Sequence, residues 1–354
     1  MNKMLDTFKF FPGLDALLLT SKANKFYFGG RYSDRGYVLL LKYQREPIYF
    51  VDYRSASDIG DEYQKIVLQK DDNPVDVVIK YIKTTNIKYL GLEGDHLSYN
   101  QFINFQEHLK ILQIESVDAD ILRYIKSDEE IETIRKACQI ADESYLSFLK
   151  KIKIGMTENE AAMILVQEMK TRGARKESFE TIVASGKHSA SPHAKTSDKV
   201  IEYGDFVTVD FGARFQNYCS DTTRTFVMGE VLDERMRDIY HIVLKAFMNA
   251  AKTVQPGVSM EAIDTAARDT IIQAGYRQNF VHHLGHSLGI ECHESPRLAQ
   301  GDKSIIQKNM VFTNEPGVYI EGLGGVRIED TFYVNETGLQ SLNTTPKELM
   351  IVEA

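Results

Sequence analysis

The chain has 354 residues, with 42 lysines and arginines against 50 aspartates and glutamates, so its formal net charge is −8. This length is typical of about two domains. Hydrophobic residues make up 43% of the sequence and charged residues 26%, proportions that suit a globular protein and exclude a wholly disordered one. The acidic balance argues against the broad basic surface that sequence-independent nucleic-acid binding requires, so we expect no nucleic-acid partner.

The apolar runs and the cysteines predict a cytoplasmic protein without a membrane partner. Asp6 and Asp15 interrupt the N-terminal region, whose longest apolar run is too short for a signal peptide, and no later run approaches the length of a membrane span. The three cysteines are odd in number and far apart, which fits neither a disulfide framework nor a CxxC metal site. Cys292 lies beside a histidine-rich segment and is either a thiol nucleophile or, as we favour, a small buried residue that lines a site.

The first third of the chain alternates short apolar runs with helical patterns. Four runs have the length of buried strands, at residues 16–19, 37–41, 48–51 and 89–92. Residues 74–82 begin with a proline and carry apolar residues at helical spacing, and residues 99–112 form a second helical pattern. This alternation predicts an α/β domain that ends near Leu122.

A strong helix start marks the boundary with a second domain. Ser127 is an N-cap residue with Glu130 at the capping-box position, so we divide the chain into domains of residues 1–126 and 127–354. A second capping box begins at Thr157. Two more helices are expected, at residues 233–254 and 259–274.

Strand-like sequence follows the helical stretches of this second domain. The runs are residues 179–184, 206–211, 218–228, 311–319 and 325–335. Helices followed by hairpin-like strands predict an α+β domain with a mostly antiparallel sheet. The order of elements is similar in residues 127–228 and 233–335, which suggests an internal duplication.

Two aspartates lie in the first predicted hairpin. Asp210 sits in an alternating strand, a turn follows around residues 214–217, and Asp221 sits in the β-branched run beyond it. Pairing about the middle of this turn places Asp210 opposite Asp221, with Cβ atoms about 4.5–5.5 Å apart. Two bare carboxylates at that distance repel each other, so we expect a positive group between them.

Two glutamates lie in the same way in a later hairpin. Pairing about Gly322, in a glycine-rich turn, places Glu315 opposite Glu329. Pro316 inside the first strand indicates an edge or a bulge, a common feature beside active sites. The alternative, acids exposed on the outer face of a sheet, is common for a single carboxylate but fits poorly with two pairs inside apolar runs.

The third element of the predicted site is the histidine-rich segment, residues 282–294. It holds four of the nine histidines within twelve residues. His282 and His286 are four residues apart, but Gly285 and Gly289 disfavour a helix, so this is not an HExxH zinc site. Histidines at this density indicate a functional site rather than isolated structural residues.

Four carboxylates and one imidazole suit a pair of divalent cations. Oxygen-rich ligation favours Mn²⁺ over a thiolate-type zinc site, with Co²⁺, Fe²⁺ or Zn²⁺ as alternatives. Two such ions about 3.5–4 Å apart can share a hydroxide, lower the pKa of its parent water and polarise a carbonyl. We therefore expect metal-assisted hydrolysis.

These motifs together resemble the Xaa-Pro peptidases, prolidase and aminopeptidase P, which share the pita-bread catalytic fold with methionine aminopeptidase and creatinase. The matching stretches of the second domain are residues 178–186, 192–193, 209–212, 220–225, 282–294, 313–317 and 325–330. The first domain resembles the family's N-terminal domain more loosely. The fold implied is an N-terminal α/β creatinase/prolidase-like domain followed by a pita-bread domain with a curved, mostly antiparallel sheet.

The resemblance implies a dinuclear metal site, and all five of its positions are intact. Asp210 would chelate one metal ion, while His286 and Glu315 would bind the other. Asp221 and Glu329 would bridge the two ions. In the family Glu315 is also the favoured proton shuttle for the bridging water.

The resemblance also implies residues that contact the substrate. His193 would contact the scissile carbonyl, His282 would line the prolyl pocket, and His293 would hydrogen-bond the substrate or the intermediate. Tyr319 matches a further substrate-binding position, and Arg327 matches an arginine that supports the ligand carboxylates. Ordinary structural roles on strands remain the alternative for Tyr319 and Arg327.

Three functions remain open at this point. A Xaa-Pro dipeptidase would need a cation for the free carboxylate of proline, and Arg297 matches an arginine that prolidases place near the site, although a surface loop arginine is the alternative. An aminopeptidase P would use the same residues on longer Xaa-Pro peptides. A creatinase-like enzyme or binding homologue would have lost metal ligands, and none is lost here. We favour the dipeptidase, acting on Xaa-Pro dipeptides, and relatives imply a homodimer.

Overall fold

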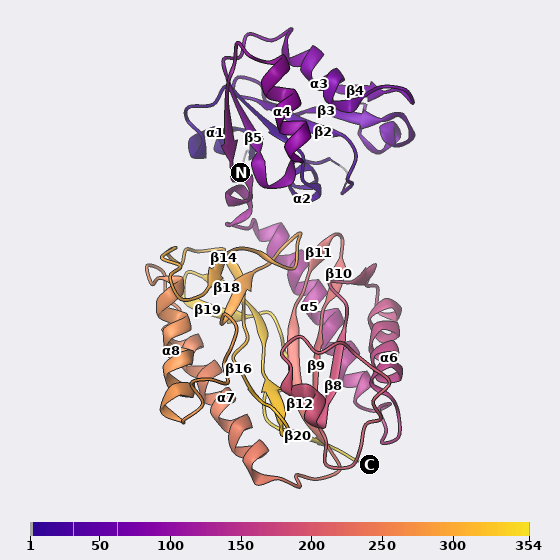
Figure 1. Ribbon diagram of the computed structural model, residues 1–354, viewed down its shortest axis with the longest axis vertical. Helices are drawn as coiled ribbons and strands as arrows, with labels where there is room; N and C mark the ends of the chain where they lie inside the picture. The colour runs from indigo at the N-terminus through magenta and orange to yellow at the C-terminus, as the bar shows by residue number, and fades with distance from the viewer. Residues whose placement is uncertain (1–2, 31, 62, 354) are drawn as a thin grey trace. The chain divides into compact units, whose positions relative to one another are not determined.

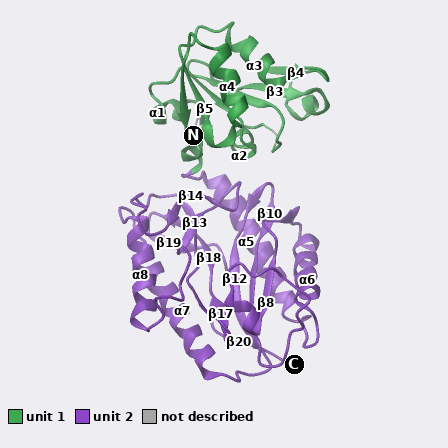
Figure 2. Ribbon diagram, in the orientation of Figure 1, with its two compact units in different colours: residues 1–123 green, residues 124–354 purple. Residues whose placement is uncertain are grey.

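The computed structural model describes residues 3–30, 32–61 and 63–353. Contacts divide the chain into two compact units, residues 1–123 and 124–354 (Figure 2). Among the described residues, each unit has hydrophobic core of its own. Within the described ranges, no helix is both long enough and apolar enough to cross a membrane.

Unit 1 is a mixed six-stranded sheet with the order β4-β3-β2-β1-β5-β6. The strands are β1 (Ala16–Leu19), β2 (Tyr37–Leu41), β3 (Ile48–Asp52), β4 (Lys65–Leu68), β5 (Tyr89–Glu93) and β6 (Gln113–Val117). β1 pairs antiparallel with β2 and parallel with β5. The four strands predicted from apolar runs form the centre of this sheet, which confirms the predicted α/β class.

Helices α3 and α4 pack on this sheet, and the helices of unit 1 are only partly predictable. α3 (Pro74–Ile82) begins after the cap residue Asn73 and buries its apolar side, as its spacing predicts. α4 (Tyr99–His108) ends four residues before the predicted end. Two short helices, α1 (Lys3–Phe10) and α2 (Lys22–Tyr27), have no counterpart in the sequence prediction.

Four long helices of unit 2 begin where the sequence predicts. Ser127 and Thr157 close capping boxes with the glutamates three residues later, and these start two of the helices. Side chains of Asp233 and Ser259 cap the other two. The helices are α5 (Asp128–Phe148), α6 (Glu158–Thr171), α7 (Glu234–Thr253) and α8 (Met260–Gln273).

The strands of unit 2 form two main sheets, with orders β20-β12-β9-β8 and β14-β13-β15-β18-β19. Pairing in both is antiparallel except between β12 and β20. Helices α5 and α6 cover one side and α7 and α8 the other, with the strands between them (Figure 1). The strands are β7 (Lys176–Glu177), β8 (Ile182–Ser185), β9 (Phe206–Phe211), β10 (Ala213–Phe215), β11 (Tyr218–Cys219), β12 (Thr222–Met228), β13 (Gly285–Ser287), β14 (Glu294–Leu298), β15 (Val311–Asn314), β16 (Gly317–Ile320), β17 (Gly324–Arg327), β18 (Asp330–Asn335), β19 (Gly338–Ser341) and β20 (Met350–Val352).

The register of the first hairpin differs from the prediction. Asp210 on β9 pairs with Thr223 on β12 and not with Asp221, because the turn is made by Gln216 and Asn217 in left-handed conformations, with φ of 47° and 68°. The partner of Asp210 is therefore two residues later than predicted, and Asp221 lies outside a strand, directly before β12.

The second hairpin follows the predicted register on both sides of the glutamates. Gly317 pairs with Arg327, and Asn314 pairs with Asp330, so Glu315 and Glu329 lie at matching positions between these pairs. Neither glutamate belongs to a strand. The strand breaks at Glu315 and Pro316, where the proline predicts an interruption.

Candidate active site

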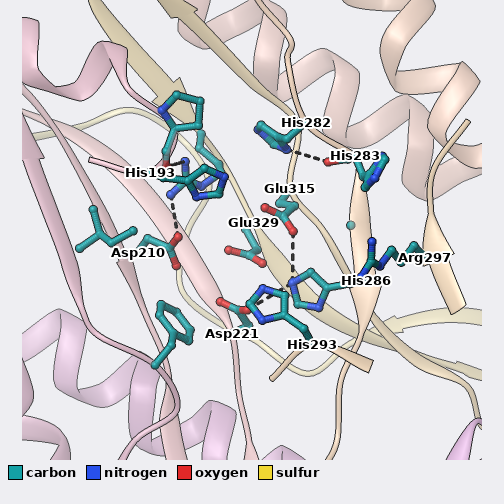
Figure 3. Close-up of a pocket in the computed structure, with 15 residues that line it drawn as sticks. His193, Asp210, Asp221, His282, His283, His286, His293, Arg297, Glu315 and Glu329 are labelled. Atoms are coloured by element: carbon teal, nitrogen blue, oxygen red, sulfur yellow. Dashed lines mark hydrogen bonds and ion pairs between the residues drawn. The ribbon is translucent and has the colours of Figure 1, made fainter. Parts of the chain in front are cut away.

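A cavity of about 390 Å³ opens in unit 2 and collects nearly all the predicted site residues (Figure 3). Those that line it are His193, Asp210, Asp221, His282, His286, His293, Arg297, Glu315, Arg327 and Glu329. Tyr319 is not among the lining residues, but its hydroxyl lies 3.0 Å from Nε2 of His282, which is. Phe179, Ile182 and Pro192 add apolar surface.

The four carboxylates come from positions where strands pair or break. Asp210 lies within β9, whereas Asp221 follows β11, Glu315 follows β15 and Glu329 precedes β18. Figure 3 shows all four carboxylates directed into the space between the histidines. Two of these acids come from each half of the unit, so the halves meet at the site.

Protein donors satisfy one side of each carboxylate. Arg327 Nη2 donates to Asp210 Oδ2 at 2.6 Å, Cys292 Sγ to Asp221 Oδ2 at 3.2 Å, Thr313 Oγ1 to Glu315 Oε1 at 3.1 Å, and Thr223 Oγ1 to Glu329 Oε2 at 2.7 Å. Two buried oxygens, Asp210 Oδ1 and Glu329 Oε1, have no hydrogen-bond partner among the described residues. Buried carboxylate oxygens without a donor are costly unless a cation compensates them.

His286 presents a lone pair to the same space. Its Nδ1 lies 3.1 Å from the Ser287 carbonyl oxygen, which fixes the ring proton on Nδ1 and leaves the Nε2 lone pair free to bind. Nε2 lies 3.5 Å from Asp221 Oδ2 and 3.4 Å from Glu315 Oε1. Burial lowers the pKa of His286 to about 3, so the ring is neutral. A neutral nitrogen facing two carboxylates calls for a positive ion between them.

The raised pKa values of three of the four acids also indicate a cation site. Burial, reinforced by the neighbouring carboxylates, raises the pKa of Asp221 and Glu329 well above the ordinary range. Burial also raises the pKa of Glu315 to about 8, although Arg327 opposes the shift. Divalent cations would favour the ionised acids and relieve this repulsion. The oxygen-rich donor set, its one imidazole and its orphaned oxygens therefore fit divalent metal ions.

A hydrogen-bonded chain connects His282 to Asp210. Nδ1 of His282 faces the His283 carbonyl oxygen at 2.7 Å, so Nε2 accepts from the Tyr319 hydroxyl. That hydroxyl accepts in turn from Arg327 Nη1 at 2.7 Å, and Arg327 also contacts Asp210. Burial is the main cause that lowers the pKa of His282 to about 3. The chain holds His282 neutral and fixed in orientation.

The remaining predicted residues face the cavity from different sides. The ring of His293 lies 4.3 Å from that of His286 between centroids. Arg297 lies on β14 opposite His286. In the view of Figure 3, His193 and Arg297 lie on opposite sides of the carboxylates. The cavity can therefore contact a small ligand at both ends.

Cys292 is a small buried residue of the site and not a thiol nucleophile. Its side chain is buried and its thiol donates to Asp221. Burial and the Asp221 charge raise the pKa of the Cys292 thiol, so the thiol is a poor nucleophile. Cys292 is a packing and hydrogen-bonding residue of the site.

Sequence reasoning missed Thr223 and Thr313, the two hydroxyls that orient candidate ligands. Thr223 lies two residues after Asp221, and Thr313 lies two residues before Glu315. Residues two apart on a strand point to the same face, so this spacing is the signal that could have identified both.

The sequence is similar to that of known metallopeptidases, as the candidate metal site predicts. Residues 132–336 match the model of metallopeptidase family M24, and residues 12–136 match the creatinase/prolidase N-terminal domain. The chain is 39% identical over 341 residues to a Xaa-Pro dipeptidase of Pyrococcus furiosus, covering 95% of each chain. These matches confirm the family resemblance seen in the sequence.

Solved structures of Xaa-Pro peptidases have the same fold as this chain. A Xaa-Pro dipeptidase from Bacillus anthracis superimposes with a TM-score of 0.92 at 36% identity, covering 99% of both chains. An X-Pro aminopeptidase from Thermotoga maritima superimposes with a TM-score of 0.87 at 34% identity, covering 96% of this chain and 98% of that one. These matches confirm the predicted fold class, a creatinase/prolidase-like N-terminal domain with a mostly antiparallel pita-bread domain. The chain belongs to metallopeptidase family M24.

Proposed function

We propose that the chain is a Xaa-Pro dipeptidase, which hydrolyses the peptide bond that precedes a C-terminal proline. The observation that carries this proposal is the buried cluster of four carboxylates around one neutral imidazole nitrogen, two of whose oxygens lack donors among the described residues. It lies in a cavity whose volume of about 390 Å³ suits a small peptide. Relatives and solved neighbours that carry the name Xaa-Pro dipeptidase support the choice.

Five residues would hold two divalent metal ions in this site. Asp210 would bind one ion, His286 and Glu315 the other, and Asp221 and Glu329 would lie between them. Such a pair of ions would lower the pKa of a water molecule in the site and polarise the scissile carbonyl. We propose Mn²⁺ first, because the donor set is rich in oxygen, and Co²⁺, Fe²⁺ or Zn²⁺ as alternatives.

Side chains of the protein would transfer the proton and bind the substrate. With the metal ions bound, Glu315 would be ionised, and it would take the proton of the attacking water and deliver it to the proline nitrogen. His193 and His293 would hydrogen-bond the carbonyl oxygen and the intermediate. His282, held by Tyr319, would line the prolyl pocket.

The second candidate is aminopeptidase P, favoured by the structural likeness to the X-Pro aminopeptidase. The two activities differ in what lies beyond the prolyl pocket. Arg297 lines the cavity and is the residue we propose to bind the carboxylate of a C-terminal proline. A homodimer in the cytoplasm is also proposed; three free, buried cysteines suit a reducing compartment.

Two assays test the proposal. After chelation, hydrolysis of Ala-Pro should disappear, and added Mn²⁺ or Co²⁺ should restore it; full activity of the metal-free protein would refute the metal site. The protein should also cleave Ala-Pro faster than Ala-Pro-Ala. Faster cleavage of the tripeptide would replace the dipeptidase with the aminopeptidase.

A further inference from the structure

Glu158, the first residue of α6, is a fully buried carboxylate outside the cavity. Its side chain is 0% exposed. Five donors converge on it: the backbone N–H and hydroxyl of Ser185, the backbone N–H and hydroxyl of Ser197, and Nδ1 of His188. The distances lie between 2.7 and 3.2 Å. A buried acid with this many donors is a specific anchor point.

These donors stand at the two ends of one loop. We call residues 186–197 the His193 loop, because it carries His193 into the cavity (Figure 3). Ser185 immediately precedes the loop, Ser197 is its last residue, and His188 lies in its first turn. One carboxylate therefore fixes both ends of the loop at a single point.

The opposite side of the loop rests on β17. Ser189 accepts from the Gly325 N–H at 2.8 Å, and Arg327 Nη1 donates to the Pro192 carbonyl oxygen at 3.3 Å. The contact is close, since a Cβ on Gly325 would lie 2.1 Å from the Ser189 carbonyl oxygen. The His193 loop is therefore held between Glu158 and the strand that carries Arg327.

Glu158 is not needed to start its helix. The N-terminus of α6 is capped by Thr157, whose side chain accepts from the Glu160 N–H, and by Glu160, whose carboxylate accepts from the Thr157 N–H at 2.8 Å. The Glu158 carboxylate points instead to the loop. Its contacts therefore serve the position of the loop and leave the cap to its neighbours.

We propose that Glu158 is a positioning residue that sets the place of His193 in the cavity, an inference that rests on the proposed function. Replacement by glutamine keeps the shape but turns one acceptor oxygen into an N–H₂ donor, which then faces N–H and O–H donors of Ser185 or Ser197. The loop ends must separate, and His193 moves with them. A displacement of about 1 Å at a substrate-contacting group can cost up to about 100-fold in rate.

The test is a double-mutant cycle on Ala-Pro hydrolysis. Glu158→Gln should lower kcat/KM about tenfold in the wild-type background and less than about twofold in a His193→Ala background, because the effect passes through His193. An equal loss in both backgrounds would overturn the proposal. Glu160→Ala is the matched control: it weakens the cap of α6 and should lower Tm while leaving kcat/KM nearly unchanged.

Hydrogen exchange gives a readout that does not depend on activity. Glu158→Gln, and the milder Ser197→Ala if the first variant does not fold, should speed amide exchange within residues 186–197, whereas Glu160→Ala should speed it at the start of α6. Unchanged exchange in the loop would contradict the inference. If the wild-type protein does not hydrolyse Ala-Pro, the proposed function is refuted. The hydrogen-exchange measurement then still decides whether Glu158 positions the His193 loop.

Discussion

Arg327 Nη2 lies 2.6 Å from Oδ2 of Asp210, so a fixed positive charge contacts the candidate metal ligand on strand β9. The same guanidinium donates to Tyr319 and Thr223. It thus connects a candidate ligand, the residue behind His282 and the donor to Glu329. Arg327 should therefore influence metal binding and substrate binding together.

Arg327→Lys tests this connection. Lysine keeps the charge but lacks the planar fork that reaches several acceptors at once. We expect metal affinity to fall about 10–100-fold, the range typical of residues that orient metal ligands. Titration of the metal-free variant with Mn²⁺ measures this, and wild-type affinity would show that charge alone suffices.

Removal of a bridging acid should be more severe. Asp221→Ala or Glu329→Ala should lower kcat by orders of magnitude, because each variant deprives both proposed ions of a ligand. Bound metal, measured by elemental analysis, should fall with activity. Glu321→Ala, at an exposed position in the turn of the second hairpin, is the control and should behave as wild type. Near-normal turnover of either variant would contradict the bridging assignment.

The raised pKa of Glu315 predicts how pH affects the metal-free fold. Burial raises this pKa from 4.5 to about 8, so across that interval the folded state binds more protons than the unfolded chain. The stabilisation from Glu315 is present below pH 4.5 and is lost as pH rises through about 8. Denaturant unfolding of the metal-free protein across this interval should show the loss, and Mn²⁺ should reduce it.

Glu315→Gln supplies the control for that pH series. Glutamine does not titrate, so the contribution of residue 315 disappears while the neighbouring acids remain. The slope of unfolding free energy against pH should be less negative in the variant than in the wild-type protein. Equal slopes would show that Glu315 keeps an ordinary pKa.

A buried ion pair behind the site predicts a large effect on stability. Arg224 Nη2 lies 2.7 Å from Asp330 Oδ1, with the two side chains 1% and 0% exposed. Asp330→Ala leaves the buried charge of Arg224 without its carboxylate and also removes the partner of Lys347, which should cost about 3–5 kcal/mol of unfolding free energy. Glu132→Ala removes an exposed partner of Arg135 and should cost at most about 1 kcal/mol. Urea unfolding measures both, and similar values would contradict the prediction.

Arg297 should separate dipeptides from longer peptides. Arg297→Met should raise KM for Ala-Pro about tenfold or more, because a charge-assisted hydrogen bond of about 1.5–3 kcal/mol is lost. KM for Ala-Pro-Ala should change little, since the proline of that peptide has no free carboxylate: its carbonyl group forms the peptide bond to the last alanine. Equal effects on both substrates would assign Arg297 to general peptide binding.

Local signals made much of the catalytic unit predictable. Ser127 and Thr157 define helix starts within four residues of sequence, so no tertiary information is needed to find them. The second hairpin keeps its register because the glycine-rich turn determines it. The first hairpin does not, since Gln216 and Asn217 are non-glycine residues that adopt positive φ, a choice that the surrounding fold dictates.

The missed strands of unit 1 have a common physical cause. β4 and β6 are the two edge strands of their sheet. β6 buries none of its five residues fully, and β4 buries only Leu68. The apolar run of β4 is only three residues long, at residues 66–68, and β6 has none, whereas the central strands carry runs of four or more residues.

The division of the four acids between the two halves of the catalytic unit has a consequence for biosynthesis. Asp210 and Asp221 come from the earlier half, while Glu315 and Glu329 are added more than ninety residues later in the chain. A ribosome-bound intermediate that has folded only the earlier half carries half of the acids and lacks His286. The full set of proposed metal ligands would therefore come together only after the later half has folded onto the earlier one.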